Sequence, residues 1–382
     1  MNRRELLKAG GLGALGLGLS GCSTGAGARL GAPGGLDLHP VRISWDRVIR
    51  TTVGLRPHRP AGFRVEAERF DDKTVVHNYG HGGAGMSLSW GTGSLAADLA
   101  LAHESRRVAV IGCGAAGLTA ARELQKRGFV VTIYAKAIPP HTTSNMSWAS
   151  FTPTSGLLSS GVNNPAWTEQ FRRAAGIAYR ELQLLVGRGY GVSWIDSYTF
   201  SDERTEGGGG GGNSLLPAAL RTGSLSLRSG EHPFPSRFAR QRPALRIEPS
   251  IYLDALLRDF AAFGGRVVVR AFDGPRDFAS LSQSLVVNCT GLGARELFRD
   301  DTMVPVKGQL TLLVPQPEVR YATLGGVPSR NADGFVHMMP RSDGIALGGT
   351  SEEGVWSLEP NEEARQRVME EHMALFAGMR TA

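Results

Sequence analysis

The chain has 382 residues, of which 41% are hydrophobic and 20% are charged, so it is too apolar to be disordered as a whole and long enough for one large domain or two ordinary ones. The formal net charge of +7 is too small to indicate a nucleic-acid-binding protein, and three cysteines exclude a disulfide framework and a four-thiolate metal site. Beyond the N-terminus there is no apolar run long enough for a membrane helix, which excludes a multi-span membrane protein.

The first 21 residues are interpreted as an export signal. Arg3 and Arg4 precede a short, weakly hydrophobic stretch, as in a twin-arginine signal peptide. The tetrapeptide at residues 19–22, LSGC, resembles a bacterial lipobox, so we expect lipidation of Cys22 and a lipid-anchored, periplasmic protein. The alternative is an ordinary amphipathic helix or an uncleaved anchor, although the glycines of this stretch disfavour a stable helix. Residues 22–40, rich in Gly, Ala and Pro, are expected to form a tether.

Two distinctive segments follow the tether. The first covers residues 54–60, GLRPHRP, and the second covers residues 76–87, VHNYGHGGAGMS. Glycines of this density allow the backbone to approach a bound group closely. His77 and His81 lie four residues apart, but on an expected glycine-rich loop without a third ligand, so no metal site is predicted. A helix is expected from Ser94 to His103.

A dinucleotide-binding unit is predicted from Arg107 onward. The run RVAVI at 107–111 is typical of a buried parallel strand, and GCGAAG follows at 112–117. An amphipathic helix is expected over 118–127 and a second strand over 129–134. The three glycines, Gly112, Gly114 and Gly117, suit the tight turn, the approach to a pyrophosphate and close helix packing, and the N-terminus of the following helix then faces the negative charge.

The second strand lacks the acidic residue that usually binds a ribose hydroxyl at its end. Lys136 occupies that place. A lysine there suggests the 2′-phosphate of NADP, or else a solvated side chain with the ribose held by backbone or water.

The remaining pattern predicts further helices and strands. Helices are expected over 167–186, 252–263 and 360–376, and strands over 192–200, 267–270, 309–314 and 344–347. Strands in the region 303–350 mostly alternate and are joined by turns, which indicates an antiparallel sheet. The six consecutive glycines within 206–213 are interpreted as a surface loop.

Taken together, these motifs resemble the D-amino-acid oxidase family over about 330 residues, in which the segment 76–87 is the most specific match. The hydroxyl-rich run at 142–144, the strand motif VNCTG at 287–291 and the segment KGQL at 307–310 are also similar to the family's FAD-binding sequence. The resemblance favours FAD over NADP. It implies that FAD is held by the following residues: Gly112, Gly114, Ala115, Ala116, Gly117, Lys136, Thr142, Thr143, Ser144, Ala149, Ser150, Gly82, Gly83, Gly85, Met86, Ser87, Thr290 and Gly291.

The same resemblance implies three substrate-binding groups. Arg56 would bind the substrate carboxylate through its two-pronged guanidinium, and Gly83 would accept a hydrogen bond from the amine at its carbonyl. The family's tyrosine for the carboxylate falls on His337, whose imidazole is also able to donate. His337 packed in the sheet without a role, and Arg56 as a surface residue, are the alternatives. The second active-site tyrosine falls near Asp333, which would disfavour an acidic substrate or select a cationic one.

The order of the motifs differs from that of the family. In the family, the segment that resembles 54–60, called here the arginine segment, and the flavin-binding loop that resembles 76–91 come last. Here they occupy 54–91, before the glycine motif, and the chain ends where the family would continue into them. We therefore expect a circular permutation, which is tolerable when termini lie close together at the surface. The alternative is a chimaeric or truncated chain whose first 100 residues fold elsewhere.

The expected fold class is α/β, with an FAD-binding Rossmann-like domain and an antiparallel-sheet substrate domain. The boundaries are signal 1–21, tether 22–40, FAD-binding domain 41–160 and 251–302, and substrate domain 161–250 and 303–382, the last with a C-terminal helix.

The implied function is an FAD-dependent oxidase that removes a hydride from the α-carbon of D-amino acids and yields a 2-oxo acid, ammonia and hydrogen peroxide. Two alternatives remain open: a D-amino-acid dehydrogenase that uses a membrane electron acceptor, and a non-catalytic flavin-binding lipoprotein. The expected partners are a D-amino acid and oxygen or another acceptor, without nucleic acid, and with membrane contact only through the lipid anchor. Cys113 and Cys289, which lie inside cofactor motifs, are expected to be buried, reduced residues.

Overall fold

The computed structural model describes residues 36–159, 164–203, 215–274, 276–330 and 335–380. The predicted signal peptide, Cys22, the six-glycine run and Asp333 lie outside the described residues.

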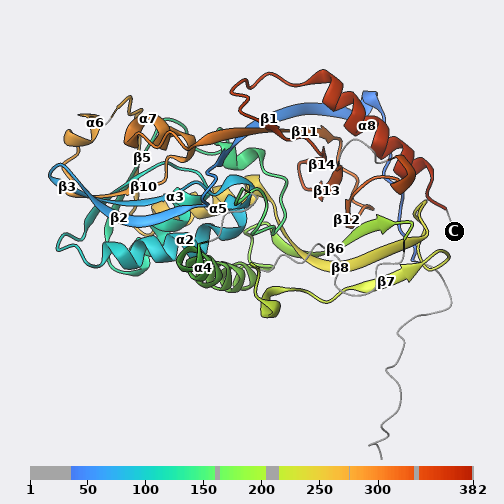
Figure 1. Cartoon of the computed structure of the whole chain (residues 1–382), viewed down its shortest axis with the longest axis horizontal. Coiled ribbons are helices and arrows are strands. Elements are labelled where there is room, and N and C mark those ends of the chain that lie inside the picture. Colours follow the sequence, from blue (N-terminus) through green and yellow to red (C-terminus); the bar gives the residue numbers. More distant parts are fainter. Residues whose placement is uncertain (1–35, 160–163, 204–214, 275, 331–334, 381–382) are drawn as a thin grey trace, which may run out of the picture. The chain divides into compact units, whose positions relative to one another are not determined.

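A six-stranded sheet contains the predicted nucleotide-binding strands (Figure 1). Its strand order is β2 (Arg64–Phe70), β3 (Lys73–Tyr79), β10 (Leu285–Asn288), β4 (Arg107–Ile111), β5 (Val130–Ala135) and β9 (Arg266–Val269). The last five strands are parallel, and β2 runs antiparallel to β3. Their β-branched, apolar sequences suit a sheet that is covered on both faces.

Helices cover both faces of this sheet. On one face, side chains such as Val76, Val110 and Val287 share a core with α2 (Gly85–Ala100), α3 (Ala115–Lys126), α4 (Pro165–Leu184) and α5 (Pro249–Ala262). On the other face, Val75 and Val286 pack in a smaller core with residues of α6 (Arg276–Ala279) and α7 (Ala294–Phe298). The parallel sheet therefore forms the middle layer of three.

The second sheet has nine strands. Its order is β1 (Val48–His58), β11 (Val304–Leu313), β14 (Gly344–Gly348), β13 (His337–Arg341), β12 (Tyr321–Leu324), β6 (Val192–Ser201), β8 (Phe238–Ile247) and β7 (Leu225–Arg228), and β15 (Glu352–Glu353) also pairs with β11. The C-terminal helix α8 (Glu362–Ala377) packs on one face through a core that includes Met338, Leu347 and Phe376 (Figure 1). Short 3-10 helices connect the described elements: η1 (Trp45–Arg47), η2 (Gly82–Ala84), η3 (Thr143–Met146), η4 (Ala218–Leu220), η5 (Gly291–Gly293) and η6 (Pro328–Arg330).

The register of the second sheet places the predicted substrate residues on its other face. His337 lies opposite Gly348, and Gly348 lies opposite Leu310, while Arg56 lies opposite Val306. Opposed residues share a face, and so do residues two apart along a strand. Arg56 and His337 therefore both point away from α8.

The early segment, residues 48–100, folds against the nucleotide-binding strands, although it precedes them in the sequence. β3 pairs in parallel with β10, which in turn pairs with β4. β1 pairs with β11 over almost its whole length, and α2 packs on α3 and α4. Residues 48–100 thus contribute β1 to the nine-stranded sheet, β2 and β3 to the six-stranded sheet, and a helix to the core.

The helix expected from Ser94 instead starts at Gly85. The glycine-rich loop that was expected to carry His77 and His81 is mostly strand and helix. His77 lies within β3, not on a loop. The prediction was wrong because glycine has a low helix propensity, whereas packing requires glycine in α2. A Cβ atom on Gly91 would lie 1.9 Å from the Ala174 carbonyl oxygen of α4, and one on Gly93 would lie 2.9 Å from the Ala120 nitrogen of α3.

Three further features differ from the expected arrangement. β1 joins the nine-stranded sheet, although residues 41–160 were expected in the FAD-binding domain. α4 packs on α2, although residues 161–250 were expected in the substrate domain. The larger sheet is not purely antiparallel, because β12 and β6 pair in parallel. All three differences depend on the surface against which a segment packs. The sequence of the segment itself does not encode that surface.

Gly117→Ala is expected to destabilise the protein by about 1–3 kcal/mol, because the new methyl group overpacks the turn. A Cβ at residue 117 would lie 2.0 Å from the Gly112 carbonyl oxygen. The free energy of unfolding, measured by denaturant titration, tests this. Gly176→Ala in α4 is the matched control, since no atom lies within 4 Å of its Cβ position, and it should be neutral or stabilising by up to about 1 kcal/mol. Equal stability of the two variants would contradict the packing assignment.

Candidate functional site

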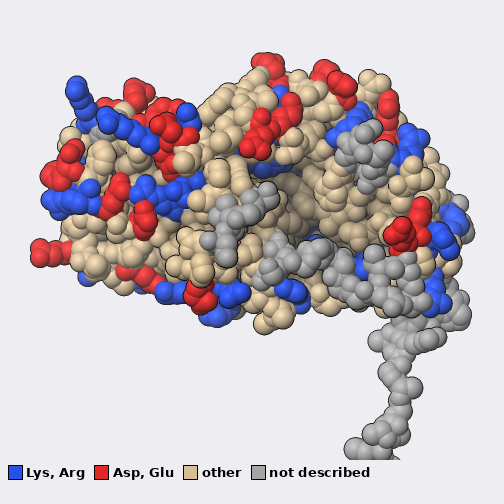
Figure 2. Space-filling model, in the orientation of Figure 1, with Lys and Arg blue, Asp and Glu red and all other residues tan. Residues whose placement is uncertain are grey.

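A cavity of about 1740 Å³ is lined by residues of both sheets. Figure 2 shows that this side of the molecule is hollowed in the middle, with acidic and basic side chains interspersed around it. Most of the residues predicted to bind cofactor or substrate line the cavity: Arg56, His337, Gly82, Gly83, Gly85, Met86, Gly112, Gly114, Ala115, Ala116, Lys136, Thr142, Thr143, Ser144, Ser150, Thr290 and Gly291. The fold therefore gathers segments from the whole chain around one space.

The glycine turn between β4 and α3 forms one wall of the cavity. Gly112 has a φ of +114°, and a Cβ atom there would lie 2.5 Å from the Cys289 carbonyl oxygen. Gly114 precedes α3, and Ala115 begins that helix. The N-terminus of a helix of this length favours a negatively charged group, which fits the pyrophosphate of a dinucleotide.

Hydroxyl groups after β5 lie beside this helix. Ser144 accepts a hydrogen bond at its Oγ from the Ala115 nitrogen at 3.0 Å. Thr142 and Asn145 cap the 3-10 helix η3, with Thr142 Oγ1 donating to Asn145 Oδ1 at 2.7 Å. Lys136 lies exposed at the end of β5. This wall thus presents hydroxyls and one ammonium group, which suit the phosphate and ribose of a nucleotide.

The turn after β10 is fixed by Asn288. Its Oδ1 accepts hydrogen bonds from the Thr290 nitrogen at 3.1 Å and the Thr290 hydroxyl at 2.7 Å. Its amide nitrogen lies 3.1 Å from His77 Nδ1, so His77 supports this turn from within the core. Thr290 and Gly291 are thereby held at the cavity wall.

Three predicted residues lie behind the wall instead of lining it. Gly117 permits the close approach of α3 to the turn, and Ala149 is fully buried with a φ of +86°. Ser87 accepts a hydrogen bond from the Thr152 nitrogen at 2.7 Å and so holds the segment that contains Ser150. Their positions are those of supporting residues, and direct cofactor contact by any predicted residue stays a prediction.

Arg56 extends its guanidinium across Gly308 on the neighbouring strand. A Cβ atom on Gly308 would lie 2.3 Å from Arg56 Nη2, so only glycine leaves room for this side chain. Both terminal nitrogens donate to the Thr350 carbonyl oxygen at 3.4 Å, and among the described residues no carboxylate pairs with Arg56. Burial lowers its pKa from the usual value. A partly buried guanidinium without a counter-ion is suited to an anionic ligand.

The Gly82–Gly83 turn approaches the segment 155–156 closely. A Cβ atom on Gly82 would lie 1.9 Å from the Gly156 carbonyl oxygen, and one on Gly83 would lie 2.8 Å from Ser155 Oγ. Gly82 also has a φ of +52°. The backbone contact requires glycine at position 82, whereas at position 83 a side chain would crowd Ser155.

His337 packs its ring against Trp148, with the ring centroids 4.3 Å apart. Its Nδ1 is buried and, within the described chain, has no hydrogen-bond partner. The same holds for Trp148 Nε1 and Asn78 Oδ1, and all three side chains line the cavity. Buried polar atoms are rarely left unpaired, so these three indicate a ligand.

Several of the lining residues were not predicted from the sequence. Asn78 lies inside the segment 76–87 and Trp148 directly precedes Ala149, but neither residue has a pattern that marks it as a binding residue. Arg242 on β8 lines the far side of the cavity, where burial and the neighbouring Arg240 lower its pKa. An arginine on an alternating strand carries no local signal, although its register opposite Ser197 places it on the face of the sheet that carries His337.

The described cysteines are free and buried, and burial raises the thiol pKa of Cys113 and Cys289 to about 12. Within the described residues, no group of three or more His, Cys, Asp and Glu side chains is placed to hold a metal ion. No helix in the described ranges is long and apolar enough to cross a membrane.

The cavity fits a dinucleotide such as FAD. It has a glycine turn at a helix N-terminus, hydroxyl groups beside that helix and unpaired polar atoms toward the second sheet. Asn78, Trp148, His337 and Arg56 then remain to contact the rest of the cofactor or the substrate.

Comparisons with known proteins agree with this reading. The family model described as FAD dependent oxidoreductase (DAO) matches residues 107–381. A D-amino-acid oxidase from Rubrobacter xylanophilus is 31% identical over 281 residues, covering 72% of this chain and 79% of the relative. A D-amino-acid oxidase from Streptomyces coelicolor is 29% identical, covering 70% of this chain and 77% of the relative, and human D-aspartate oxidase is 26% identical, covering 71% and 76%.

Among solved structures, glycine oxidase from Bacillus cereus is 14% identical and aligns with a TM-score of 0.48, covering 70% of this chain and 77% of that chain. The FAD-bound L-α-glycerophosphate oxidase from Mycoplasma pneumoniae aligns with a TM-score of 0.49 at 14% identity, covering 73% and 80%.

The family match spans more than half of the chain and confirms the predicted resemblance, the mixed α/β fold and the choice of FAD as cofactor. The chain belongs to the DAO family of FAD-dependent oxidoreductases.

Proposed function

We propose that this oxidoreductase oxidises D-amino acids, with Arg56 as the group that binds the substrate carboxylate. The observation that carries the proposal is the Arg56 guanidinium, which lies at the cavity wall beside Gly308 without a carboxylate partner among the described residues. The names of the relatives, D-amino-acid oxidase and D-aspartate oxidase, support the same substrate class.

The chain's own residues would bind and orient the substrate. Arg56 would donate two hydrogen bonds to the carboxylate, a geometry that its planar guanidinium favours. The Gly83 carbonyl would accept from the amine, and His337 would donate to the carboxylate from the neighbouring strands. Loss of a hydride from the α-carbon and a proton from the amine leaves an imino acid, which water hydrolyses to a 2-oxo acid and ammonia. When bound, FAD supplies the hydride acceptor, and oxygen then takes the electrons as hydrogen peroxide.

His337 would act as a neutral hydrogen-bonding group. Burial, the neighbouring His372 and Arg56 lower its pKa from 6.5 to about 3, so the imidazole is uncharged at neutral pH. A neutral imidazole donates from one nitrogen only, and Nδ1 is the atom that lacks a partner in the described chain.

The proposal includes export and a permuted chain order. Export by the twin-arginine route with a lipid anchor on Cys22 is supported by the sequence motif, and a folded FAD site loaded before export requires a route for folded proteins. A circular permutation is supported by the family match, which begins at β4, while the preceding β1 and β3 each pair with a strand inside the matched region.

The direct test is anaerobic mixing of the FAD-loaded full chain with a panel of D- and L-amino acids. Bleaching of the visible flavin absorbance by D-amino acids, with hydrogen peroxide formed once air is admitted, is expected. Bleaching without peroxide would indicate a dehydrogenase that passes electrons to another acceptor. An unchanged spectrum with every D-amino acid would refute the proposal.

Arg56→Lys is expected to weaken carboxylate binding by about 1.5–3 kcal/mol, since the ammonium group replaces a two-pronged donor by a single one. The measurement is the KM for the best D-amino acid. Arg50→Lys is the control on the same strand, because Arg50 is exposed and pairs with Asp343. A KM in Arg56→Lys equal to that of the wild type would remove Arg56 from the site.

Replacement of His337 by Gln is expected to weaken the acid dependence of stability. The folded pKa lies below the unfolded value of 6.5, so the unfolded chain binds the extra proton as the pH falls from about 6.5 toward 3. His337 therefore contributes stability that is present above pH 6.5 and is lost over this window, with a slope of at most about 1.4 kcal/mol per pH unit. Urea unfolding of both proteins between pH 7 and pH 4 measures it. Parallel stability curves would show that His337 does not carry the lowered pKa.

A further inference from the structure

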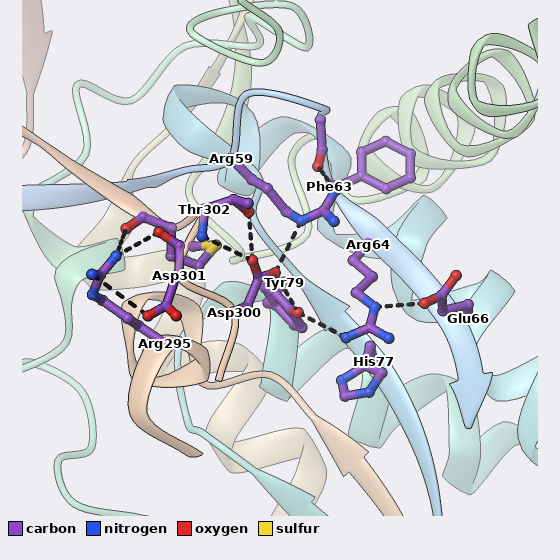
Figure 3. A network of polar contacts seen from close by, with 12 residues as sticks. Arg59, Phe63, Arg64, Glu66, His77, Tyr79, Arg295, Asp300, Asp301 and Thr302 are labelled. Carbon is purple, nitrogen blue, oxygen red and sulfur yellow. Dashed lines mark hydrogen bonds and ion pairs between the residues drawn. The ribbon is translucent and has the colours of Figure 1, made fainter. Parts of the chain in front are cut away.

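The carboxylate of Asp300 joins two corners of the early segment, residues 48–100, to the rest of the chain. One corner follows β1, and the other follows β3. Asp300 lies between α7 and β11, and its side chain is 8% exposed. Its Oδ2 accepts from Arg59 Nε at 3.0 Å and from the Tyr79 hydroxyl at 2.7 Å (Figure 3). Its Oδ1 accepts from the Thr302 nitrogen at 3.2 Å and from the Thr302 hydroxyl. All of its strong acceptor positions are therefore engaged.

The two corners are those that carry the proposed substrate-binding groups. Arg59 follows Arg56 by three residues, just beyond the end of β1. Tyr79 ends β3 and precedes Gly83 by four residues. The corners also touch each other, because a Cβ atom on Gly80 would lie 3.1 Å from Arg59 Cβ, and His58 forms a bridge with His81. A displacement at Asp300 would reach both substrate groups through short, packed stretches of backbone.

Further contacts determine which groups donate and which accept in the hydrogen bonds of this network. Arg64 donates from Nη1 to the Tyr79 hydroxyl at 3.2 Å, so the hydroxyl accepts from Arg64 and donates to Asp300 (Figure 3). Arg64 is itself paired with Glu66 at 2.6 Å and Glu68 at 2.7 Å. Burial acts to raise the pKa of Asp300, but hydrogen bonds from Thr302 and Tyr79 and the ion pair with Arg59 outweigh it and lower that pKa. The carboxylate is therefore charged at neutral pH.

We propose that Asp300 is a positioning residue that sets the distance between the Arg56 guanidinium and the Gly83 carbonyl, and so matches the site to a ligand that carries both a carboxylate and an amine. The inference rests on the proposed function, in which these two groups bind the amino acid. Asp300 itself is absent from the cavity lining and acts through Arg59 and Tyr79.

This role makes the effect of Asp300 depend on the ligand. D-Alanine must reach both Arg56 and Gly83, so its binding is sensitive to the spacing between them. Propionate has the same carbon chain and carboxylate but no amine, so it needs the carboxylate-binding groups Arg56 and His337 but not Gly83. General damage to the site would weaken both ligands together, whereas a change in spacing would weaken D-alanine selectively.

Asp300→Asn in the FAD-loaded full chain tests the proposal. The amide keeps the size of the side chain but carries no charge and has only one acceptor oxygen, so in either orientation the ion pair with Arg59 is lost. We expect the KM for D-alanine to rise about tenfold, while the inhibition constant of propionate and the flavin spectrum stay within about twofold of the wild type. Asp301→Asn is the matched control, because Asp301 is 82% exposed and contacts Arg295 (Figure 3).

Tyr79→Phe keeps the test valid if Asp300→Asn fails to fold. It removes one arm of the network, and it should raise the KM for D-alanine in the same selective way. A double variant in which both Tyr79 and Arg59 lose their contacts with Asp300 should lose less binding free energy for D-alanine than the sum of the losses in the two single variants. The two losses are not independent, because both residues act through Asp300.

Equal weakening of D-alanine and propionate, or no change in either, would overturn the positioning role while leaving the proposed function intact. A wild-type protein whose flavin no D-amino acid reduces would overturn both.

Discussion

The parallel pairing of β3 with β10 is the interaction on which the remaining structure depends. Through it the early segment becomes part of the nucleotide-binding sheet, with Val75, Val76 and His77 opposite Val286, Val287 and Asn288. The pairing brings the Gly82–Gly83 turn to the edge where β4 and β10 end, because parallel strands that are neighbours finish at the same edge of the sheet. Without this ladder, the glycine turn after β4 and the arginine of β1 would belong to unrelated surfaces.

Residues of both sheets line the cavity because strands that follow each other along the chain belong to different sheets. β1 and β3 are joined by a single antiparallel strand, β2, so one short stretch carries a strand into each sheet. Arg56 therefore reaches the cavity from the second sheet, and the glycines reach it from the first. The charged network around Asp300 links the segment after β1 to the end of β3 through the side chains of Arg59 and Tyr79. Ion pairs in such a partly buried position act over short distances and depend strongly on geometry.

Local patterns predicted the nucleotide-binding unit well, because a β-branched run, a glycine turn and an amphipathic helix follow each other without interruption at 107–134. Helix α2 was missed over half its length, since its glycines signal a loop locally and are explained only by the backbone of α4 and α3. The partners of Asp300 were also not predictable. The segment around it is polar and irregular, and nothing in it encodes contact with residues more than two hundred positions away.

The pairing of β1 with β11 has a consequence for how the protein is made. Arg56 lies opposite Val306, a separation of 306 − 56 = 250 residues, so a ribosome must synthesise most of the chain before β1 finds its neighbour. Until then an eleven-residue strand has unsatisfied backbone groups on both sides. Contacts this distant slow folding and prolong the exposure of apolar surface. During synthesis, β1 therefore stays without its sheet partner for longer than a strand that pairs with a near neighbour in the sequence.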